Sequence, residues 1–259
     1  MSHPLQIISQ VLLEDYKVRQ PLTLSKHFEA LKRKGKHVDF DFYISYAAVY
    51  SSNIEGNIMD FDTYTRVRLS GMNATGKSFR EIEDLRAAYL FARGAALDEG
   101  NFLKAHNIAS QTIIEEDKYR GTYRDREVYV VKDAKIVYTG CPAVDIPLEM
   151  QKLFTDIATL LSSELTIEEV FYYASMLHLC FVHIHPFADG NGRTARLLEK
   201  WFLSIKLGEA SWLIPSEKLY HERIRMYYRN VDLGVDYPSL NYAYALPFLL
   251  MLPMALKIK

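Results

Sequence analysis

Apolar residues recur at helical spacing along most of the chain. An early example is the stripe formed by Tyr43, Ala47, Tyr50 and Ile54. Gly56 follows it, at a position where helices commonly end in a left-handed turn. The pattern also predicts a helix from about Asp62 to Ser70 that Gly71 ends. The first part of the chain is therefore expected to be helical.

Two Ser/Thr-x-x-Glu sequences predict helix starts. In Ser78-Phe-Arg-Glu81 and Thr166-Ile-Glu-Glu169, the hydroxyl and the carboxylate can each bond a free backbone N–H, which makes a capping box. The first precedes an apolar face made of Ile82, Leu85, Tyr89 and Ala92. The second precedes a face made of Phe171, Ala174, Leu177, Phe181 and Ile184. We expect this second helix to run up to His185.

Between Glu127 and Thr139 the pattern changes from helical spacing to β-rich runs. Glu-Val-Tyr-Val-Val and Ile-Val-Tyr-Thr flank the polar stretch Lys132-Asp133-Ala134-Lys135, which predicts a single hairpin. Because an isolated hairpin is marginally stable, it must lie against helices. The predicted fold class is all-α with one hairpin, in one or two domains.

The longest uncharged apolar stretch runs from Tyr242 to Leu256. It is shorter than the roughly 20 residues that a spanning helix needs, and Pro247 and Pro253 interrupt it. We interpret it as a buried C-terminal helix, with a membrane anchor as the alternative.

Charge and cysteine content narrow the classes of function. Lys and Arg number 31 against 32 Asp and Glu, so no overall field attracts nucleic acid or an anionic membrane. Any phosphate binding must be local. Cys141 and Cys180 are the only cysteines and no signal segment opens the chain, which favours the cytoplasm.

A polar loop lies between two apolar helical segments. It reads His185-Pro-Phe-Ala-Asp-Gly-Asn-Gly-Arg-Thr-Ala-Arg196. The segment after it has an apolar face made of Leu197, Leu198, Trp201, Phe202 and Ile205. Gly190 and Gly192 allow a tight turn, and the N–H groups that open the next helix can receive an anion. The loop therefore predicts a phosphate site.

The charged residues of this loop suit a polyphosphate. Arg193 and Arg196 lie three apart on the first helical turn, where cations oppose the helix dipole unless an anion is bound. Asp189 offers a hard oxygen ligand for Mg²⁺. His185 offers an imidazole that can take a proton near neutral pH.

The loop resembles the signature of the Fic family, His-Pro-Phe-x-(Asp/Glu)-Gly-Asn-Gly-Arg-x-x-Arg, at every fixed position. The resemblance covers roughly residues 80–235. It implies a helical enzyme that uses ATP and Mg²⁺ to transfer AMP onto a Ser, Thr or Tyr hydroxyl of a target protein. We assign residues 80–259 to the catalytic domain with a C-terminal helix, and residues 1–79 to an N-terminal helical extension.

The resemblance also implies a role for each residue of the motif. His185 would be the general base, and Asp189 would hold Mg²⁺. Phe187 would anchor the loop in the core. The α- and β-phosphates would lie against Gly190, Asn191 and Gly192, while the β- and γ-phosphates would be bound by Arg193 and Arg196.

Two further features resemble parts of the family less closely. Tyr227 and Tyr228 are similar to paired tyrosines near the adenine pocket, and a packed aromatic pair is the alternative. The hairpin resembles a flap whose strand edge pairs with an extended target segment. Its strands carry Val128, Tyr129, Val130, Ile136, Val137 and Tyr138. A hairpin without a partner is the alternative.

Ser51-Ser-Asn-Ile-Glu55-Gly56 matches a second family pattern, (Ser/Thr)-x-x-x-Glu-(Gly/Asn), which marks an inhibitory helix. Glu55 would end a helix, where the dipole disfavours a carboxylate unless a cation compensates. We expect Arg196 to be that cation, so that Glu55 and Ser51 keep it from the γ-phosphate. The family also implies that this glutamate can orient a water for AMP removal.

Other functions compete with this interpretation. Gly71-Met-Asn-Ala-Thr-Gly-Lys-Ser78 fits a P-loop, but the residues before it predict a helix where a P-loop needs a strand. A non-enzymatic binding module would have a damaged loop, and this loop is intact. Transfer of another phosphate-containing group stays open, as does a homodimer.

Overall fold

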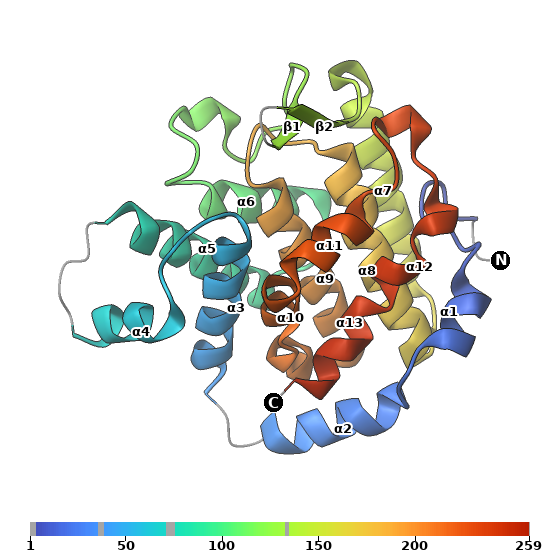
Figure 1. Cartoon of the computed structure of the whole chain (residues 1–259), viewed down its shortest axis with the longest axis horizontal. Coiled ribbons are helices and arrows are strands. Elements are labelled where there is room, and N and C mark those ends of the chain that lie inside the picture. Colours follow the sequence, from blue (N-terminus) through green and yellow to red (C-terminus); the bar gives the residue numbers. More distant parts are fainter. Residues whose placement is uncertain (1–3, 36–38, 71–75, 133–134, 259) are drawn as a thin grey trace.

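Two adjacent helices, α8 (Ile167–Ile184) and α9 (Asn191–Leu207), lie at the centre of the structure (Figure 1). The computed structural model describes residues 4–35, 39–70, 76–132 and 135–258. From Val170 to Ile184, every residue of α8 except Val182 is buried. A helix that is buried on nearly all sides belongs in a core, and several other helices pack against this one.

The surrounding helices come from both sides of this pair in the sequence. Before it along the chain lie α1 (Leu13–Arg19), α2 (Leu24–Gly35), α3 (Phe40–Ile54), α4 (Phe61–Leu69), α5 (Lys77–Gly94), α6 (Glu99–Ala109) and α7 (Ile146–Ser162). After it lie α10 (Ser216–Glu222), α11 (Ile224–Val231), α12 (Leu246–Leu249) and α13 (Met251–Met254). The apolar faces predicted for α5 and α8 are buried, whereas Ile205 of α9 is exposed, against expectation.

One of the two predicted capping boxes is present. At the start of α8, Thr166 and Glu169 exchange the expected side-chain bonds. The box at Ser78 is wrong: α5 begins at Lys77, Gly76 is its N-cap, and no side chain caps it. Asn57 donates instead to the Glu81 carboxylate and to the Ser78 carbonyl. Tertiary contacts therefore outweigh the local pattern.

Helix α3 ends as its sequence predicts. Gly56 has a φ of 91°, its N–H donates to the Asn53 carbonyl, and the Asn57 N–H donates to the Ser52 carbonyl. These bonds form a Schellman motif. The buried face is rotated from the predicted stripe, because Tyr43 and Tyr50 are partly exposed. Its buried residues include Ile44, Ala47, Ala48, Ser51 and Ile54.

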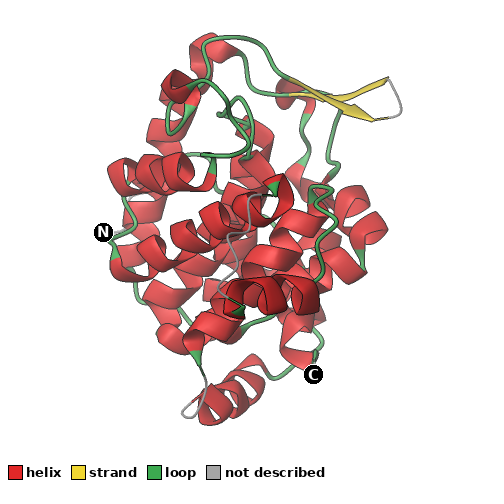
Figure 2. Ribbon diagram, turned by 90° about the vertical axis from the view of Figure 1, so that its left-hand side faces the viewer, coloured by secondary structure: helices red, strands yellow, loops and turns green. Residues whose placement is uncertain are grey.

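Strands β1 (Tyr129–Lys132) and β2 (Lys135–Thr139) form the predicted antiparallel hairpin. It stands out from one end of the helices (Figure 2). The ladder is irregular between Val130 and Val131. Asp133 and Ala134, within the predicted turn, lie outside the described residues. The all-α fold class with one hairpin is confirmed.

The predicted C-terminal helix is wrong in form. Tyr242 to Leu256 folds into short pieces that include α12 and α13, with Pro247 in the first turn of α12 and Pro253 inside α13. Proline interrupts the helical hydrogen-bond ladder, which explains the breaks. The segment packs onto the core. Within the described ranges, no helix is long and apolar enough to cross a membrane.

Candidate active site

His185 lies where α8 ends, in the left-handed conformation with φ 54°. It is the one non-glycine residue with positive φ in the described part of the chain. Its Nδ1–H donates to the Val182 carbonyl oxygen at 3.0 Å. Because a carbonyl can only accept, Nε2 carries the free lone pair of the neutral ring. Burial, together with the nearby Arg124, lowers the pKa of His185 below its ordinary value. The imidazole is therefore neutral at pH 7 and can accept a proton.

Asn191 closes the loop between α8 and α9. Its Oδ1 accepts from the Phe187 N–H, and its Nδ2 donates to the Phe187 carbonyl, both at 2.9 Å. Phe187 is fully buried, as expected for a loop anchor. Gly190 has a φ of 80° as the N-cap of α9, a conformation that favours glycine. The Asn191 side chain thus holds the loop, and its backbone faces the predicted phosphate site.

His106 supports this loop from α6, and the sequence gave no sign of it. Its ring stacks on Phe187, with centroids 3.5 Å apart. The Gly121 N–H donates to Nδ1, so Nε2 carries the hydrogen and donates to the Asp189 carbonyl at 3.0 Å. Burial lowers the pKa of His106 to about 4. A lone histidine on a helix face normally indicates only a core residue, which is why it was missed.

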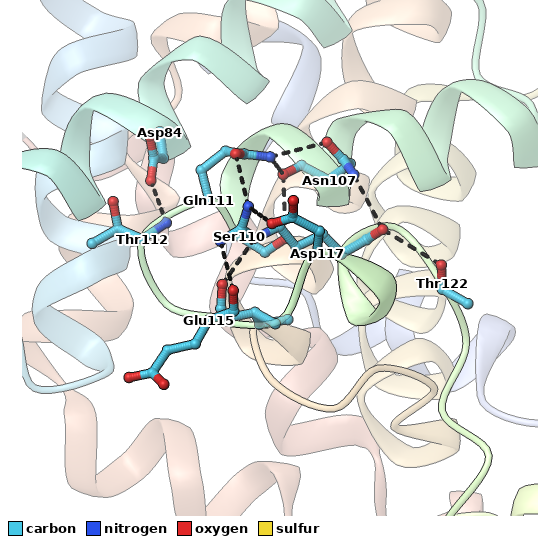
Figure 3. Close-up of polar contacts among 10 residues, drawn as sticks. Asp84, Asn107, Ser110, Gln111, Thr112, Glu115, Asp117 and Thr122 are labelled. Atoms are coloured by element: carbon cyan, nitrogen blue, oxygen red, sulfur yellow. Dashed lines mark hydrogen bonds and ion pairs between the residues drawn. The ribbon is translucent and has the colours of Figure 1, made fainter.

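The segment that carries Gly121 is itself held by polar contacts (Figure 3). The Thr112 N–H donates to Asp84 of α5 at 2.8 Å. Asn107 of α6 donates to the Arg120 carbonyl at 3.1 Å. These bonds fix the segment whose Gly121 N–H donates to His106.

The start of α9 presents donors without acceptors. The first backbone bond within the helix runs from the Thr194 N–H to the Gly190 carbonyl. The N–H groups of Asn191, Gly192 and Arg193 have no acceptor among the described residues. Arg193 is 8 % exposed, yet its Nε and Nη1 also lack a partner there. Buried donors left unpaired are costly, so this cluster fits a polyphosphate.

Arg196 is fully buried and joins three of the predicted site residues. Its Nε donates to the Ser51 hydroxyl at 2.8 Å, and its Nη2 donates to the Ser51 carbonyl at 2.9 Å. Nη2 also pairs with Glu55 Oε1 at 2.7 Å. Nη1 donates to the Tyr227 hydroxyl at 3.2 Å. The guanidinium is thus occupied by α3 and α11.

The Glu55 carboxylate lies against Gly192 at the start of α9. A β-carbon built on Gly192 would lie 3.2 Å from Glu55 Cδ and closer still to Oε1. Glu55 therefore lies beside the start of α9, the helix start at which the sequence predicts phosphate. Its side chain is 29 % exposed, so the contact lies at the edge of the core.

Tyr227 and Tyr228 are packed together edge to face, with ring centroids 5.4 Å apart. Tyr227 is buried, whereas Tyr228 is half-exposed and donates to the Ile54 carbonyl at 3.0 Å. The packed-pair interpretation describes this arrangement, and an adenine-pocket role stays a prediction.

Behind Tyr227 lies a buried polar pair that sequence reasoning missed. His178 Nδ1 bonds the Glu199 carboxylate at 2.9 Å, so its Nε2 accepts from the Tyr227 hydroxyl at 3.0 Å. The chain of hydrogen bonds continues from Tyr227 to Arg196. It fixes the arginine from the core side.

Asp189 is exposed, and its Oδ1 accepts from the Gly190 N–H at 2.6 Å. Within the described ranges, no group of three or more His, Cys, Asp or Glu side chains could hold a metal ion. Mg²⁺ usually needs only one or two protein carboxylates, with water and substrate phosphates as its other ligands. The remaining Asp189 oxygen fits that donor set.

The hairpin residues differ in their exposure. Tyr129, Ile136 and Val137 are exposed, whereas Val128 and Val130 are partly buried. Tyr138 is partly buried and donates to the His183 carbonyl at 2.6 Å. The hairpin is thus attached to the end of α8 and carries exposed apolar side chains.

The P-loop interpretation lacks its structural context. Helix α4 precedes the Gly-Lys-Ser sequence, and Lys77 and Ser78 lie in the first turn of α5. Gly71 to Thr75 lie outside the described residues. A P-loop follows a strand, and this segment follows a helix.

Comparison with known proteins agrees with the loop geometry. A family model described as Fic/DOC family matches residues 96–203. Residues 96–203 of the chain are thus similar to the Fic/DOC family. A protein adenylyltransferase Fic of Aedes aegypti is 31% identical over 179 residues, 65% of this chain and 33% of that protein. Protein adenylyltransferase fic-1 of Caenorhabditis elegans is 30% identical over 196 residues, 73% of this chain and 36% of that protein. The chain thus spans about a third of these curated Fic relatives.

Solved structures show the same fold. A Fic family protein from Desulfovibrio desulfuricans G20 aligns with a TM-score of 0.76 at 21% identity, over 98% of this chain and 74% of that one. Fic-1 from C. elegans aligns with a TM-score of 0.60 at 20% identity, over 90% of this chain and 68% of that one. The Fic fold is therefore shared at low sequence identity.

Proposed function

We propose that this protein transfers AMP from ATP to a hydroxyl side chain of a target protein, and that Glu55 holds the activity down. The observation that carries the proposal is the set of unpaired donors at the start of α9, next in the chain to a loop that begins with His185. The names of the relatives, protein adenylyltransferases, support the same reaction.

The transfer step follows from the free lone pair of His185. Nε2 takes the proton of the target hydroxyl as its oxygen attacks the α-phosphorus of ATP. The new O–P bond forms as the bond from the α-phosphorus to the bridging β-phosphate oxygen breaks. Pyrophosphate leaves with that electron pair. One positioned base of this kind contributes about 10²–10⁴-fold to the rate.

The start of α9 would hold the phosphates. The N–H groups of Asn191, Gly192 and Arg193 would bind the α- and β-phosphates, and the free donors of Arg193 would bind the outer ones. Asp189 would hold Mg²⁺, which supplies positive charge against the phosphate oxygens.

The inhibitory contact would act because Glu55 and the ATP phosphates compete for the same site at the start of α9. Glu55 pairs with Arg196 and lies against Gly192, so a triphosphate bound at the start of α9 would meet this carboxylate. ATP would then lie with its α-phosphate misaligned for attack. We divide the chain accordingly into an extension, residues 1–79, and a catalytic part, residues 80–259. The same Glu55 carboxylate could orient a water that removes AMP.

The target would bind beside the hairpin. Tyr129, Ile136 and Val137 offer an exposed apolar face, and strand edges bind extended backbone with little sequence selectivity. The partner is therefore a protein with a modifiable hydroxyl side chain in an extended segment.

Labelled ATP tests the reaction. The protein is incubated with α-labelled or γ-labelled ATP and Mg²⁺, and label retained on protein is measured. AMP transfer retains the α-label and loses the γ-label. Transfer of the γ-label alone would make the protein a kinase and end the proposal.

A further inference from the structure

The end of α8 that presents His185 is capped by the hairpin segment. The last carbonyl groups of a helix have no partner within the helix and must find donors elsewhere. Here the His183 carbonyl accepts from the Tyr138 hydroxyl, and the Ile184 carbonyl accepts from the Cys141 N–H at 3.2 Å. Both donors come from β2 or the residues just after it.

Arg124 completes this cap from the other side of the hairpin. Its Nε donates to the His185 carbonyl at 2.8 Å, and its own backbone N–H donates to the Pro186 carbonyl at 2.9 Å. The side chain is buried. Four consecutive carbonyl groups, from residue 183 to residue 186, therefore accept hydrogen bonds from the segment 124–141.

The remaining donors of Arg124 bond the backbone at both ends of the hairpin. Nη1 donates to the Arg126 carbonyl at 2.7 Å, before β1. Nη2 donates to the Cys141 carbonyl at 2.6 Å, after β2. One rigid guanidinium thus donates to three backbone carbonyl groups: one before β1, one after β2, and that of His185.

The fit around this guanidinium is close. A β-carbon on Gly140 would lie 2.9 Å from Arg124 Nη2 and 3.1 Å from the His185 β-carbon. A larger residue there would crowd Arg124 and His185, and this crowding does not come from the backbone conformation, since Gly140 does not have a positive φ. The backbone at residue 140 touches Arg124 and His185 at once.

We infer that Arg124 is a positioning residue: it holds His185 in its left-handed conformation and links that conformation to the place of the hairpin. This inference rests on the proposed function, in which His185 is the base and the target binds beside the hairpin. A left-handed histidine persists only where its surroundings determine it, and Arg124 bonds its carbonyl directly. A target that moves the hairpin would therefore move the base.

Three substitutions separate the geometry of Arg124 from its charge. Arg124→Lys keeps the charge, but an ammonium cannot reach three carbonyl groups in a fixed fork. Arg124→Gln removes both. Gly140→Ala leaves Arg124 intact and crowds it. Arg126→Gln is the matched control, because it removes an exposed arginine two residues away whose guanidinium lies over Tyr119.

The kinetic test uses these variants in a Glu55→Gly background, with transfer of α-label onto the chain itself as the readout. Arg124→Lys and Gly140→Ala are expected to slow transfer by about tenfold to a hundredfold, the cost of misplacing a reacting group by about 1 Å. ATP affinity, measured by calorimetry, is expected to stay within about twofold of the parent. Transfer at the parent rate in both variants overturns the inference.

A titration of His185 by NMR tests the contact without using activity. The charged groups that face His185 are Arg124, which lowers its pKa after burial, and Glu55 and Asp189, which raise it. His183 is the other histidine that interacts with it. Arg124→Gln is expected to raise the pKa of His185, while Arg124→Lys and Arg126→Gln leave it near the parent value. An unchanged pKa in Arg124→Gln overturns the inference.

The two measurements distinguish a failed inference from a failed function. If the Glu55→Gly parent transfers no label, the proposed function is wrong, and the titration alone decides whether Arg124 acts on His185. If Arg124→Gln does not fold, Arg124→Lys and Gly140→Ala carry the kinetic test.

Discussion

The carboxylate of Glu55 lies over the backbone of Gly192, so close that the glycine has no room for a β-carbon. Glu55 follows the last residue of α3, where the helix dipole disfavours a negative charge, but it faces the start of α9, where a negative charge is favoured. Arg196 supplies the opposite charge at 2.7 Å. The Glu55 carboxylate thus lies beside the helix start that we propose binds phosphate.

The first prediction concerns the base. His185→Ala should abolish transfer of the α-label, because it removes the Nε2 lone pair that we propose takes the proton of the target hydroxyl. The fold and ATP binding should be retained, since Asn191 still closes the loop. Single-turnover transfer and ATP calorimetry measure the two effects. Near-normal transfer would remove His185 from the mechanism.

The second prediction concerns the unpaired guanidinium. Arg193→Met removes the two buried donors that lack partners among the described residues, Nε and Nη1. Without ATP, the free energy of unfolding should stay the same or rise, by up to about 1–3 kcal/mol. ATP affinity should fall by about tenfold or more, because charge-assisted hydrogen bonds to phosphate are lost. Denaturant unfolding and calorimetry give the two values. A loss of stability with unchanged ATP affinity would mean that Arg193 is structural.

The third prediction separates the two candidate nucleotide sites. Lys77 is exposed at the start of α5, and its nearest ion-pair partner in the described part of the chain is Glu81 at 3.9 Å. Lys77→Ala should therefore change neither ATP affinity nor transfer. A loss of ATP binding in this variant, with His185→Ala still active, would restore the P-loop interpretation.

The fourth prediction concerns pH and stability through His106. Its pKa is about 4 in the folded protein, against an ordinary value of 6.5, so the unfolded chain binds the proton first as the pH falls. The stabilisation is complete above pH 6.5 and is lost between pH 6.5 and 4, by about 3 kcal/mol. Glutamine can keep both hydrogen bonds and does not titrate. Between pH 7.5 and pH 4, the free energy of unfolding of the wild type in urea should therefore fall by about 3 kcal/mol more than that of His106→Gln. An equal fall in both proteins would contradict this.

The conformation of the loop from His185 to Arg196 could be predicted because its turn and helix start lie within a short stretch of consecutive residues. Gly190 and Asn191 have the turn and the helix start that their residue types suggest. The helix end at Glu55 and Gly56 could also be predicted, since it depends on local sequence and needs no knowledge of tertiary structure. The Arg196 contact of Glu55 required the family pattern, because 141 residues separate the two.

The supports of the site could not be predicted in the same way. His106, His178 and Arg124 each act through contacts with residues far along the chain. Single polar residues on apolar segments carry no local pattern that says what they bond. The helix start near Ser78 was predicted two residues late, with Ser78 in place of Gly76 as the N-cap, for a related reason: Asn57 bonds the Glu81 carboxylate.

The fifth prediction concerns the inhibitory contact and stability. Glu55→Gly removes one partner of an arginine that is fully buried, which costs more than the ~0–1 kcal/mol of an exposed pair. The melting temperature without ATP should fall, and Mg-ATP should recover part of the loss by binding the folded state. An unchanged melting temperature would mean that the pair does not hold α3 in place.

The most direct test of the account is the rate of α-label transfer from Mg-ATP in four proteins: wild type, Glu55→Gly, Arg196→Ala and the double variant. We expect Glu55→Gly to raise the rate strongly, and Arg196→Ala in that background to cancel most of the gain, because the two residues share one interaction. His185→Ala in the Glu55→Gly protein is the control and should give no transfer. If Glu55→Gly transfers label at the wild-type rate, with ATP bound in the same orientation in crystals of both, then Glu55 does not block the phosphate site and the account is wrong.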